Sequence, residues 1–229
     1  MTYAIGDIHG CNRSFCALLD ALHPDAADRL ILLGDYIDRG PDSKGVIDTI
    51  VRLREHGHEV VCLRGNHEQM LLDAVGGDAQ DREYWVLNGG HSTLKSFGVH
   101  RPEDIPAHYL DFFTDTRYWY ETGDYLCVHG GLDFSHTDPL SRPESLLWMR
   151  GWYAGIDYAW LGKRIILHGH TPVDTGTINT QHAALAKQQY LNLDNGCVYA
   201  GNKQRGKDLG KLAAFCLETQ QLHWQANVE

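Results

Sequence analysis

Short apolar runs that each end in a polar, glycine-containing motif recur along the chain, and they constrain its fold more than any other feature. The first three runs are residues 3–5, 29–33 and 59–63, and amphipathic segments separate them. Short, continuously apolar runs are typical of strands buried on both faces, whereas a periodicity of about 3.6 residues is typical of helices. The order strand–helix–strand–helix–strand predicts parallel pairing with right-handed crossovers.

The rest of the chain alternates less regularly between helical and strand-like segments. A glycine turn between residues 117–120 and 125–128 predicts a β-hairpin. Residues 76–116 are expected to form a helical insertion over one edge of the functional site, including a helix at 82–87 that Gly89 and Gly90 stop. Further expected elements are a helix at 104–113, strands at 163–167, 190–193, 212–217 and 221–224, and a tight turn at 194–196.

The composition narrows the possible partners. The chain has 229 residues, 43% apolar and 22% charged, which suits one domain over residues 1–229 with a sizeable core. Its formal net charge of -10 argues against a nucleic-acid partner, because such binding needs Lys and Arg to displace counterions from phosphates. An acidic site for divalent cations would account for part of this charge, and an acidic surface for the rest.

Cysteine spacing and the position of the first motif bear on the cellular compartment. The six cysteines show no paired metal-ligand spacing, so we expect reduced thiols. The first motif begins at Gly6, which leaves no room for a signal peptide. The longest apolar run, 212–217, is far shorter than the roughly 20 residues that span a bilayer. We therefore expect a cytoplasmic protein without a membrane partner, and we favour a monomer.

Metal-binding side chains lie at the ends of the apolar runs, where open α/β folds place their chemistry. Carboxylate, imidazole and amide ligands suit Mn, Fe or Zn, and the lack of a thiolate argues against a structural zinc site. Six protein ligands are too many for one catalytic ion but suit two ions that share a bridging carboxylate. The candidate ligands are Asp7, His9, Asp35, Asn66, His129 and His170, with His168 as the alternative to His170.

Three arginines within or beside the same motifs suit phosphate recognition. Arg39, Arg64 and Arg150 carry paired N–H donors that can grip phosphate oxygens, and we add Asn66 to this phosphate-binding set. His67 remains as a proton donor to a leaving oxygen, with Asp38 as the carboxylate that orients it. These residue types therefore predict phosphoryl transfer at a two-metal site.

Taken together, the motifs resemble those of the calcineurin-like metallophosphoesterases. More narrowly, they resemble the short bacterial and phage-type serine/threonine phosphatases of the phosphoprotein-phosphatase family. The resemblance is carried by GDIHG at 6–10, GDYIDRG at 34–40, LRGNHE at 63–68, HGG at 129–131 and GHTP at 169–172. The order and spacing of these motifs make the match specific over residues 6–172, and the tail strands match as well.

The resemblance implies an α/β fold with two mixed β-sheets in a sandwich, flanked by helices, and two divalent metal ions at the strand ends. We favour Mn, with Fe or Zn as alternatives. Pro172 stands where more distant metallophosphoesterases carry an additional histidine, so the first metal should have one protein ligand fewer. By motif position, the first metal would be bound by Asp7 and His9, the bridge would be Asp35, and the second metal would be bound by Asn66, His129 and His170. The general acid would be His67 with Asp38 behind it, and phosphate would be held by Arg39 and Arg150 with Arg64 assisting.

Several functions are compatible with this resemblance. The first is hydrolysis of phosphoserine or phosphothreonine, with phosphotyrosine as a further option, by a metal-activated hydroxide. The second is symmetrical cleavage of dinucleoside tetraphosphates, an activity that shares these motifs. The acidic charge and the missing histidine disfavour a nuclease. A non-catalytic binding scaffold is the alternative from another class, and the intact set of ligands, acid and arginines weighs against it.

Substrate choice is expected to come from irregular segments around the site, because a compact metal-filled floor recognises phosphate and little else. The candidates are the aromatic insertion at 76–116 and a basic loop at 203–211. A long polyphosphate would need more cations than Arg39, Arg64 and Arg150. This comparison favours a phosphoprotein or small phosphoester over a dinucleoside tetraphosphate.

Overall fold

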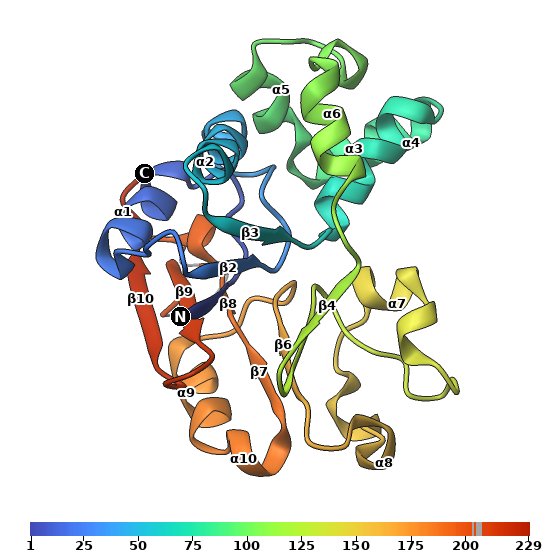
Figure 1. The fold of residues 1–229 in the computed structure, drawn as a ribbon. Helices are drawn as coiled ribbons and strands as arrows, with labels where there is room; N and C mark the ends of the chain where they lie inside the picture. The colour runs from blue at the N-terminus through green and yellow to red at the C-terminus, as the bar shows by residue number, and fades with distance from the viewer. Residues whose placement is uncertain (203, 205–207) are drawn as a thin grey trace.

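Two β-sheets packed face to face form the centre of the protein in a computed structural model that describes residues 1–202, 204 and 208–229 (Figure 1). The strand order is β10-β9-β1-β2-β3 in the first sheet, where β8 also pairs with β9, and β4-β5-β6-β7 in the second. The strands are β1 Thr2–Ile5, β2 Arg29–Leu32, β3 Glu59–Cys62, β4 Trp119–Thr122, β5 Tyr125–Val128, β6 Ile165–His168, β7 Tyr190–Asn192, β8 Asp194–Asn195, β9 Lys211–Cys216 and β10 Leu222–Ala226.

Both sheets are mixed, which confirms the predicted fold class. In the first sheet β1, β2 and β3 run parallel, whereas β9 is antiparallel to β1, β8 and β10. In the second sheet β4 and β5 form the predicted antiparallel hairpin, and β5, β6 and β7 run parallel. The parallel strands place the motifs that follow them at a common edge of each sheet.

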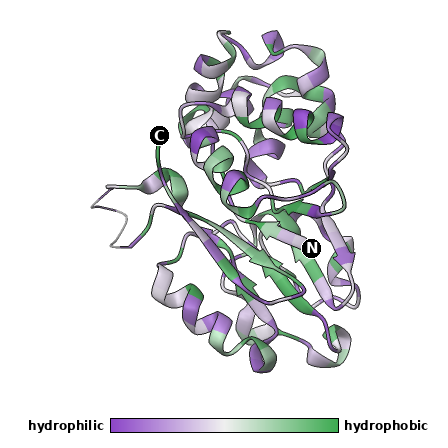
Figure 2. Ribbon diagram, turned by 60° about the vertical axis from the view of Figure 1, so that its left-hand side comes forward, coloured by the Kyte–Doolittle hydropathy of each residue, from purple (hydrophilic) through white to green (hydrophobic). Residues whose placement is uncertain are grey.

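The central strands are apolar at successive positions because both of their faces are buried. Around β2, Leu30 and Leu32 belong to the core under the helices, while Ile31 and Leu33 belong to the core between the sheets. Such a strand has no polar face, so its sequence does not alternate. Figure 2 shows these strands as the hydrophobic centre of the molecule, with hydrophilic residues spread over the surrounding helices.

Helices cover the outer face of each sheet. Asp42 caps α2, since its side chain accepts a hydrogen bond from Gly45 N at 2.9 Å. Over the first sheet lie α1 Asn12–Leu22, α2 Ser43–Glu55 and α3 Asn66–Gly76; over the second lie α7 Pro143–Trp148, the 3-10 turn η4 Trp152–Gly155 and α8 Tyr158–Leu161. The remaining elements outside the insertion are η3 Pro139–Ser141, α9 Thr175–Ala183, α10 Leu185–Gln188 and η5 Cys197–Tyr199.

The insertion at 76–116 is helical, as predicted, but two of its boundaries differ from the prediction. Gly89 and Gly90 do not stop a helix, because the helical turns continue through a kink at Gly89 into α5. The helix predicted at 104–113 begins only after Pro106, whose ring cannot continue a helix from the preceding turn. The segment comprises α4 Ala79–Trp85, the π-helical turn η1 Val86–Gly90, α5 His91–Phe97, the 3-10 turn η2 Pro102–Asp104 and α6 Ala107–Thr114.

The predicted tight turn at 194–196 is wrong for its first two residues. Asp194 and Asn195 form β8, so the chain passes directly from the second sheet into the first after Leu193. This crossing lies against Gly6, where a β-carbon would meet Leu193 O at 2.1 Å. The crossing therefore brings Asp194 beside the motif that follows β1.

Other predictions concern the cysteines, the membrane and the basic loop. All six cysteines are free thiols. Within the described part of the chain, no helix is both long enough and apolar enough to cross a membrane. The basic loop predicted at 203–211 falls partly outside the described residues, which do not include Lys203, Arg205 and Lys207.

Candidate metal centre and active site

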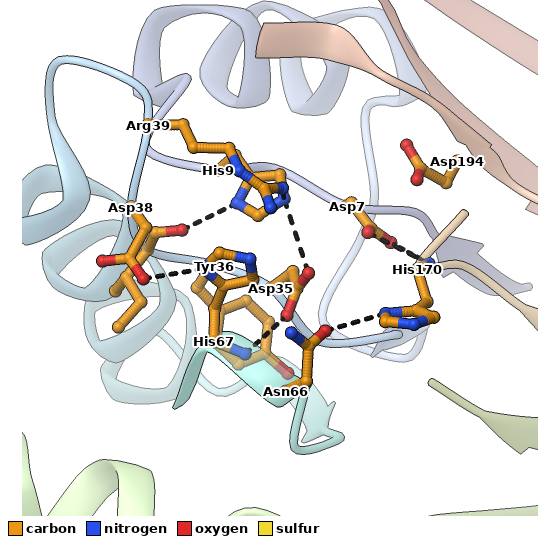
Figure 3. A network of polar contacts seen from close by, with 12 residues as sticks. Asp7, His9, Asp35, Tyr36, Asp38, Arg39, Asn66, His67, His170 and Asp194 are labelled. Carbon is orange, nitrogen blue, oxygen red and sulfur yellow. Dashed lines mark hydrogen bonds and ion pairs between the residues drawn. The ribbon is translucent and has the colours of Figure 1, made fainter. Parts of the chain in front are cut away.

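The predicted metal ligands come from both sheets and converge in one buried place (Figure 3). They follow β1, β2, β3, β5 and β6, so both sheets contribute from their carboxyl edges. Each polar side chain here is held away from water, and none is more than 4% exposed. The residues are the predicted ligands Asp7, His9, Asp35, Asn66, His129 and His170, together with the predicted acid His67.

Asp35 belongs to both of two groups of possible metal ligands. Its Oδ2 lies 3.4 Å from His9 Nε2, and its Oδ1 lies 3.3 Å from His129 Nε2. The first group consists of His9, Asp35 and His67 and the second of Asp35, His129 and His170, with ligand atoms within 4.8 Å of one another. One carboxylate thus faces both groups, which is the arrangement that a bridging ligand requires.

Asn66 extends the second group with an amide oxygen. Asn66 Oδ1 lies 3.0 Å from His129 Nε2 and 2.8 Å from His170 Nδ1. Asn66 is the first residue of α3, so the end of β3 and the start of the helix fix its position. An amide oxygen and two imidazole nitrogens therefore meet at the same point, and this mixture of oxygen and nitrogen ligands suits a divalent transition-metal ion.

The arrangement of protons leaves lone pairs facing oxygen atoms. His129 Nδ1 lies 2.9 Å from Leu33 O and donates to it, so a neutral His129 has its lone pair on Nε2, toward Asn66 Oδ1. Similarly, His9 Nδ1 donates to Ile37 O at 2.8 Å, so its Nε2 is an acceptor; this atom lies 3.4 Å from Asp35 Oδ2 and receives a hydrogen bond from the positively charged Arg39. Two facing acceptors repel unless a positive charge lies between them. The donor set therefore fits divalent cations.

Burial keeps these imidazoles in the form that binds metals. It lowers the pKa of His129, and together with the neighbouring Arg39 guanidinium it lowers the pKa of His9 well below its usual value. Burial, followed by the nearby His129, lowers the pKa of His170 to about 2. Neutral imidazoles present lone pairs at neutral pH, as metal binding requires.

Asp7 and Asp194 form a second acidic feature at one side of this cluster. Asp7 lies outside both ligand groups, and its two carboxylate oxygens accept from His170 N at 3.2 and 3.1 Å. Burial and the Asp194 carboxylate raise the pKa of Asp7, and burial raises the pKa of Asp194 to about 7. Two neighbouring buried carboxylates whose pKa values are both raised are stabilised in their charged forms by a nearby cation. Sequence reasoning missed Asp194, although it follows an apolar run as the other motifs do.

His67 and Asp38 make direct contact, in the arrangement proposed for an acid and its orienting carboxylate. His67 Nδ1 lies 2.7 Å from Asp38 Oδ2, and both side chains are buried. His67 N also donates to Asp35 Oδ1 at 3.1 Å, which ties the histidine to the central carboxylate. Since Asp38 holds Nδ1, Nε2 is the nitrogen available for proton transfer.

Several site residues have left-handed backbone conformations, which are unfavourable for side chains other than glycine. Such strain persists only where surrounding contacts enforce it, and it clusters at functional sites. The backbone conformation of the loops after β1, β2 and β6 therefore directs these side chains into the site. The residues are His9 with φ 47°, Asp35 with φ 53°, Asp38 with φ 71°, Arg39 with φ 69° and His170 with φ 70°.

Glu68 holds the central loop in this conformation. Its carboxylate accepts hydrogen bonds from Asp35 N at 2.9 Å, Tyr36 N at 2.8 Å and Gly65 N at 2.8 Å. It is fully buried and stands in the first turn of α3. Glu68 thus fixes the backbone of Asp35 from the first turn of α3.

The three predicted phosphate-binding arginines differ in their surroundings. Arg39 is half-buried and donates to His9 Nε2, while Arg150 is exposed and donates to Thr171 Oγ1 at 2.9 Å. Arg64 is buried and donates to Thr116 Oγ1, Gln69 Oε1, Tyr118 Oη and the carbonyl oxygens of Phe113 and Thr114. All of its N–H directions are used by the fold, so the structure argues against its predicted role in assisting phosphate binding.

The choice between His168 and His170 follows from their neighbours. His168 Nε2 lies 3.0 Å from Tyr153 Oη, and its ring packs against Trp152. His170 instead directs Nδ1 at Asn66, and its Nε2 is buried without a hydrogen-bond partner among the described residues. The geometry therefore favours His170 as the ligand and gives His168 a structural environment.

Comparison with known proteins complements this geometry. A serine/threonine-protein phosphatase 1 of Salmonella typhimurium is 30% identical over 214 residues, covering 87% of this chain and 88% of that protein. A symmetrical bis(5'-nucleosyl)-tetraphosphatase of Nitrosomonas europaea is 33% identical over 132 residues, covering 57% of this chain and 44% of that protein. The chain thus spans less than half the length of this tetraphosphatase.

A solved structure and a family model complete the comparison. A serine/threonine phosphatase from Saccharomyces cerevisiae has the same fold, with a TM-score of 0.66 and 17% identity, covering all of this chain and 80% of that one. The family model described as calcineurin-like phosphoesterase matches residues 2–201. With the paired ligand groups and the two mixed sheets, this match establishes that the chain belongs to the calcineurin-like phosphoesterase family.

Proposed function

We propose that this phosphoesterase is a metal-dependent phosphomonoesterase that hydrolyses phosphoserine and phosphothreonine. The observation that carries the proposal is the Asp35 carboxylate, which faces two groups of ligands beside the His67–Asp38 pair. A binding scaffold has no need for a proposed acid that is oriented beside a carboxylate shared by two ligand groups. Measuring hydrolysis of a generic aryl phosphate with and without added Mn distinguishes an enzyme from a binding scaffold.

The residues divide into metal ligands and substrate groups. Divalent ions, when bound, would supply the Lewis acidity that activates water and offsets charge on phosphoryl oxygens. His67 donates a proton from Nε2 to the leaving oxygen, because Asp38 already holds Nδ1. Arg39 and Arg150 hold phosphate oxygens. By motif position the first ion would be held by Asp7, His9 and Asp35, with His67, which the structure groups with His9 and Asp35, kept as the acid. The second ion would be held by Asp35, Asn66, His129 and His170.

The number of available cations supports a monoester substrate. Because Arg64 is committed to Thr116, Gln69 and their neighbours, Arg39 and Arg150 are the two of the three predicted arginines left for phosphate. Two arginines suit one phosphoryl group better than a chain of four. The near full-length similarity to the Salmonella phosphatase supports the same class of substrate.

Symmetrical cleavage of dinucleoside tetraphosphates is the second candidate. The similarity to the Nitrosomonas tetraphosphatase favours it, over 57% of this chain. Exposed side chains in the insertion, Tyr84 and Leu87, offer apolar surface for either an adenine or a peptide.

Catalytic efficiencies on a phosphothreonine peptide and on diadenosine tetraphosphate, measured with Mn in one buffer, test this choice. We expect the peptide to be the better substrate. The tetraphosphatase proposal is favoured instead if diadenosine tetraphosphate is cleaved efficiently to two ADP and the catalytic efficiency on the peptide is about a hundredfold lower. That ratio corresponds to a difference of some 2.7 kcal/mol in transition-state binding.

A further inference from the structure

The carboxylate behind the proposed acid receives two hydrogen bonds from the insertion. Trp85 in α4 donates from Nε1 to Asp38 Oδ2 at 2.9 Å, and Thr93 in α5 donates from Oγ1 to Asp38 Oδ1 at 2.6 Å. Both side chains are completely buried, as is Asp38. With His67 Nδ1 on Oδ2 as well, both oxygens of the carboxylate are engaged.

The same segment also fixes the backbone on which Asp38 stands. Asp38 N donates to Thr93 Oγ1 of the insertion at 2.9 Å and also to Ser43 Oγ, at the start of α2, at 3.1 Å. The next amide, Arg39 N, donates to Gly89 O at 3.2 Å. Since Asp38 and Arg39 both have positive φ, these bonds hold two consecutive residues in a conformation that the isolated loop would avoid.

The chemical nature of the donors is informative. A buried carboxylate without donors is costly, and an arginine or lysine partner would neutralise it. Indole and hydroxyl groups satisfy the oxygens without adding a positive charge. Of the three side chains that contact the Asp38 carboxylate, only His67 can carry a positive charge that would offset the negative charge of Asp38.

We propose that Trp85 and Thr93 are positioning residues for the phosphoesterase reaction, holding Asp38 so that His67 presents Nε2 to the leaving group. This inference rests on the proposed role of His67 as the acid. It assigns the insertion a task in catalysis itself, in addition to any influence on substrate choice. A purely structural Trp85 would only fill the space beside Gly90, where a β-carbon would lie 2.5 Å from the indole ring.

Each variant in the test removes one side-chain donor to the Asp38 carboxylate, and Thr93→Val also removes an acceptor for Asp38 N. Trp85→Phe keeps a buried aromatic ring, and Thr93→Val keeps the branched side chain without its hydroxyl. Each should lower kcat on a phosphothreonine peptide by about tenfold, with a smaller loss on an aryl phosphate whose leaving group needs little protonation. KM and the bound metal per chain should stay unchanged. Thr93→Ser restores a hydroxyl and should recover most of the rate.

Tyr109→Phe is the matched control, because Tyr109 also lies in the insertion and donates to a carboxylate, Asp48 Oδ1, at 2.6 Å. That contact lies outside the proposed acid pair, so we expect kcat to stay at the level of the unaltered protein. In an Asp38→Asn background, Trp85→Phe should change kcat by less than about twofold, since the group it positions is already altered.

The outcomes separate this inference from the proposed function. If Asp38→Asn and His67→Asn lose turnover selectively on the peptide but Trp85→Phe and Thr93→Val do not, Trp85 and Thr93 only pack and the inference fails. Equal losses on peptide and aryl phosphate in the Trp85 and Thr93 variants also overturn it. If Asp38→Asn and His67→Asn themselves show no selectivity for the peptide, the proposed acid is wrong. Should Trp85→Phe fail to fold, the comparison of Thr93→Val with Thr93→Ser decides alone.

Discussion

Replacing Gly89 with alanine should impair both stability and phosphate binding, because this glycine touches the loop that carries Arg39. Gly89 has φ 118° and ψ 0°, a conformation that L-residues rarely adopt. A β-carbon there would lie 2.8 Å from Arg39 Cγ and 3.0 Å from Arg39 N. The substitution therefore strains its own backbone and pushes against a proposed phosphate ligand.

Two costs add in this variant. The unfavourable backbone conformation costs about 1–3 kcal/mol, and overpacking a close contact costs about 1–3 kcal/mol more. Gly98 provides the matched control in the same insertion, since its φ is +69° and a β-carbon there would meet no atom within 4 Å. Gly98→Ala should cost only its backbone term, about 1–2 kcal/mol.

Urea unfolding and inhibition by inorganic phosphate measure the two effects. We expect Gly89→Ala to lose more unfolding free energy than Gly98→Ala and to weaken phosphate inhibition by about tenfold, because Arg39 is displaced. Gly98→Ala should bind phosphate normally. In an Arg39→Ala background, Gly89→Ala should weaken inhibition by less than about twofold further. Equal stability losses in the two glycine variants, with phosphate inhibition unchanged, would refute the reasoning.

The remaining predictions concern metals, acid and arginines. Extensive chelation should abolish hydrolysis and Mn should restore it; full turnover by verified metal-free protein would contradict the proposal. His67→Asn should keep its metals yet lose about 10²–10⁴-fold in turnover of alkyl phosphates and less for aryl phosphates. Arg39→Ala and Arg150→Ala should retain metals and each lose roughly 1.5–3 kcal/mol of phosphate binding, seen as weaker product inhibition; unchanged inhibition in both would remove them from the site. His170→Ala should lose bound metal by elemental analysis while His168→Ala keeps it, and the opposite result would exchange their roles.

The sequence by itself determined the strands that carry the site and the family to which the chain belongs. The runs that became β1, β2 and β3 are apolar at successive positions because both faces are buried, so local composition reports the strand directly. Parallel strands bring their carboxyl ends to one edge, and the motif after each run therefore locates Asp7, Asp35 and Asn66 near one another.

Tertiary structure alone decided how individual side chains are used. Arg64 stands in a motif and looked like a phosphate ligand, but its donors reach Thr116 and Tyr118, 52 and 54 residues away. Gly89 and Gly90 looked like a helix stop, although their lack of side chains serves close packing against Arg39 and Trp85.

Trp85 and Thr93 contact Asp38 across sequence separations of 47 and 55 residues, and no local sequence pattern predicts these contacts. A periodic run records whether a segment is buried, since every residue in it responds to the same environment. A single hydrogen bond between distant segments leaves no such repeated signal, because it depends on how the insertion packs against the loop after β2. The sequence could thus locate the proposed acid, His67, and its carboxylate, Asp38, whereas only the folded chain reveals which side chains hold them.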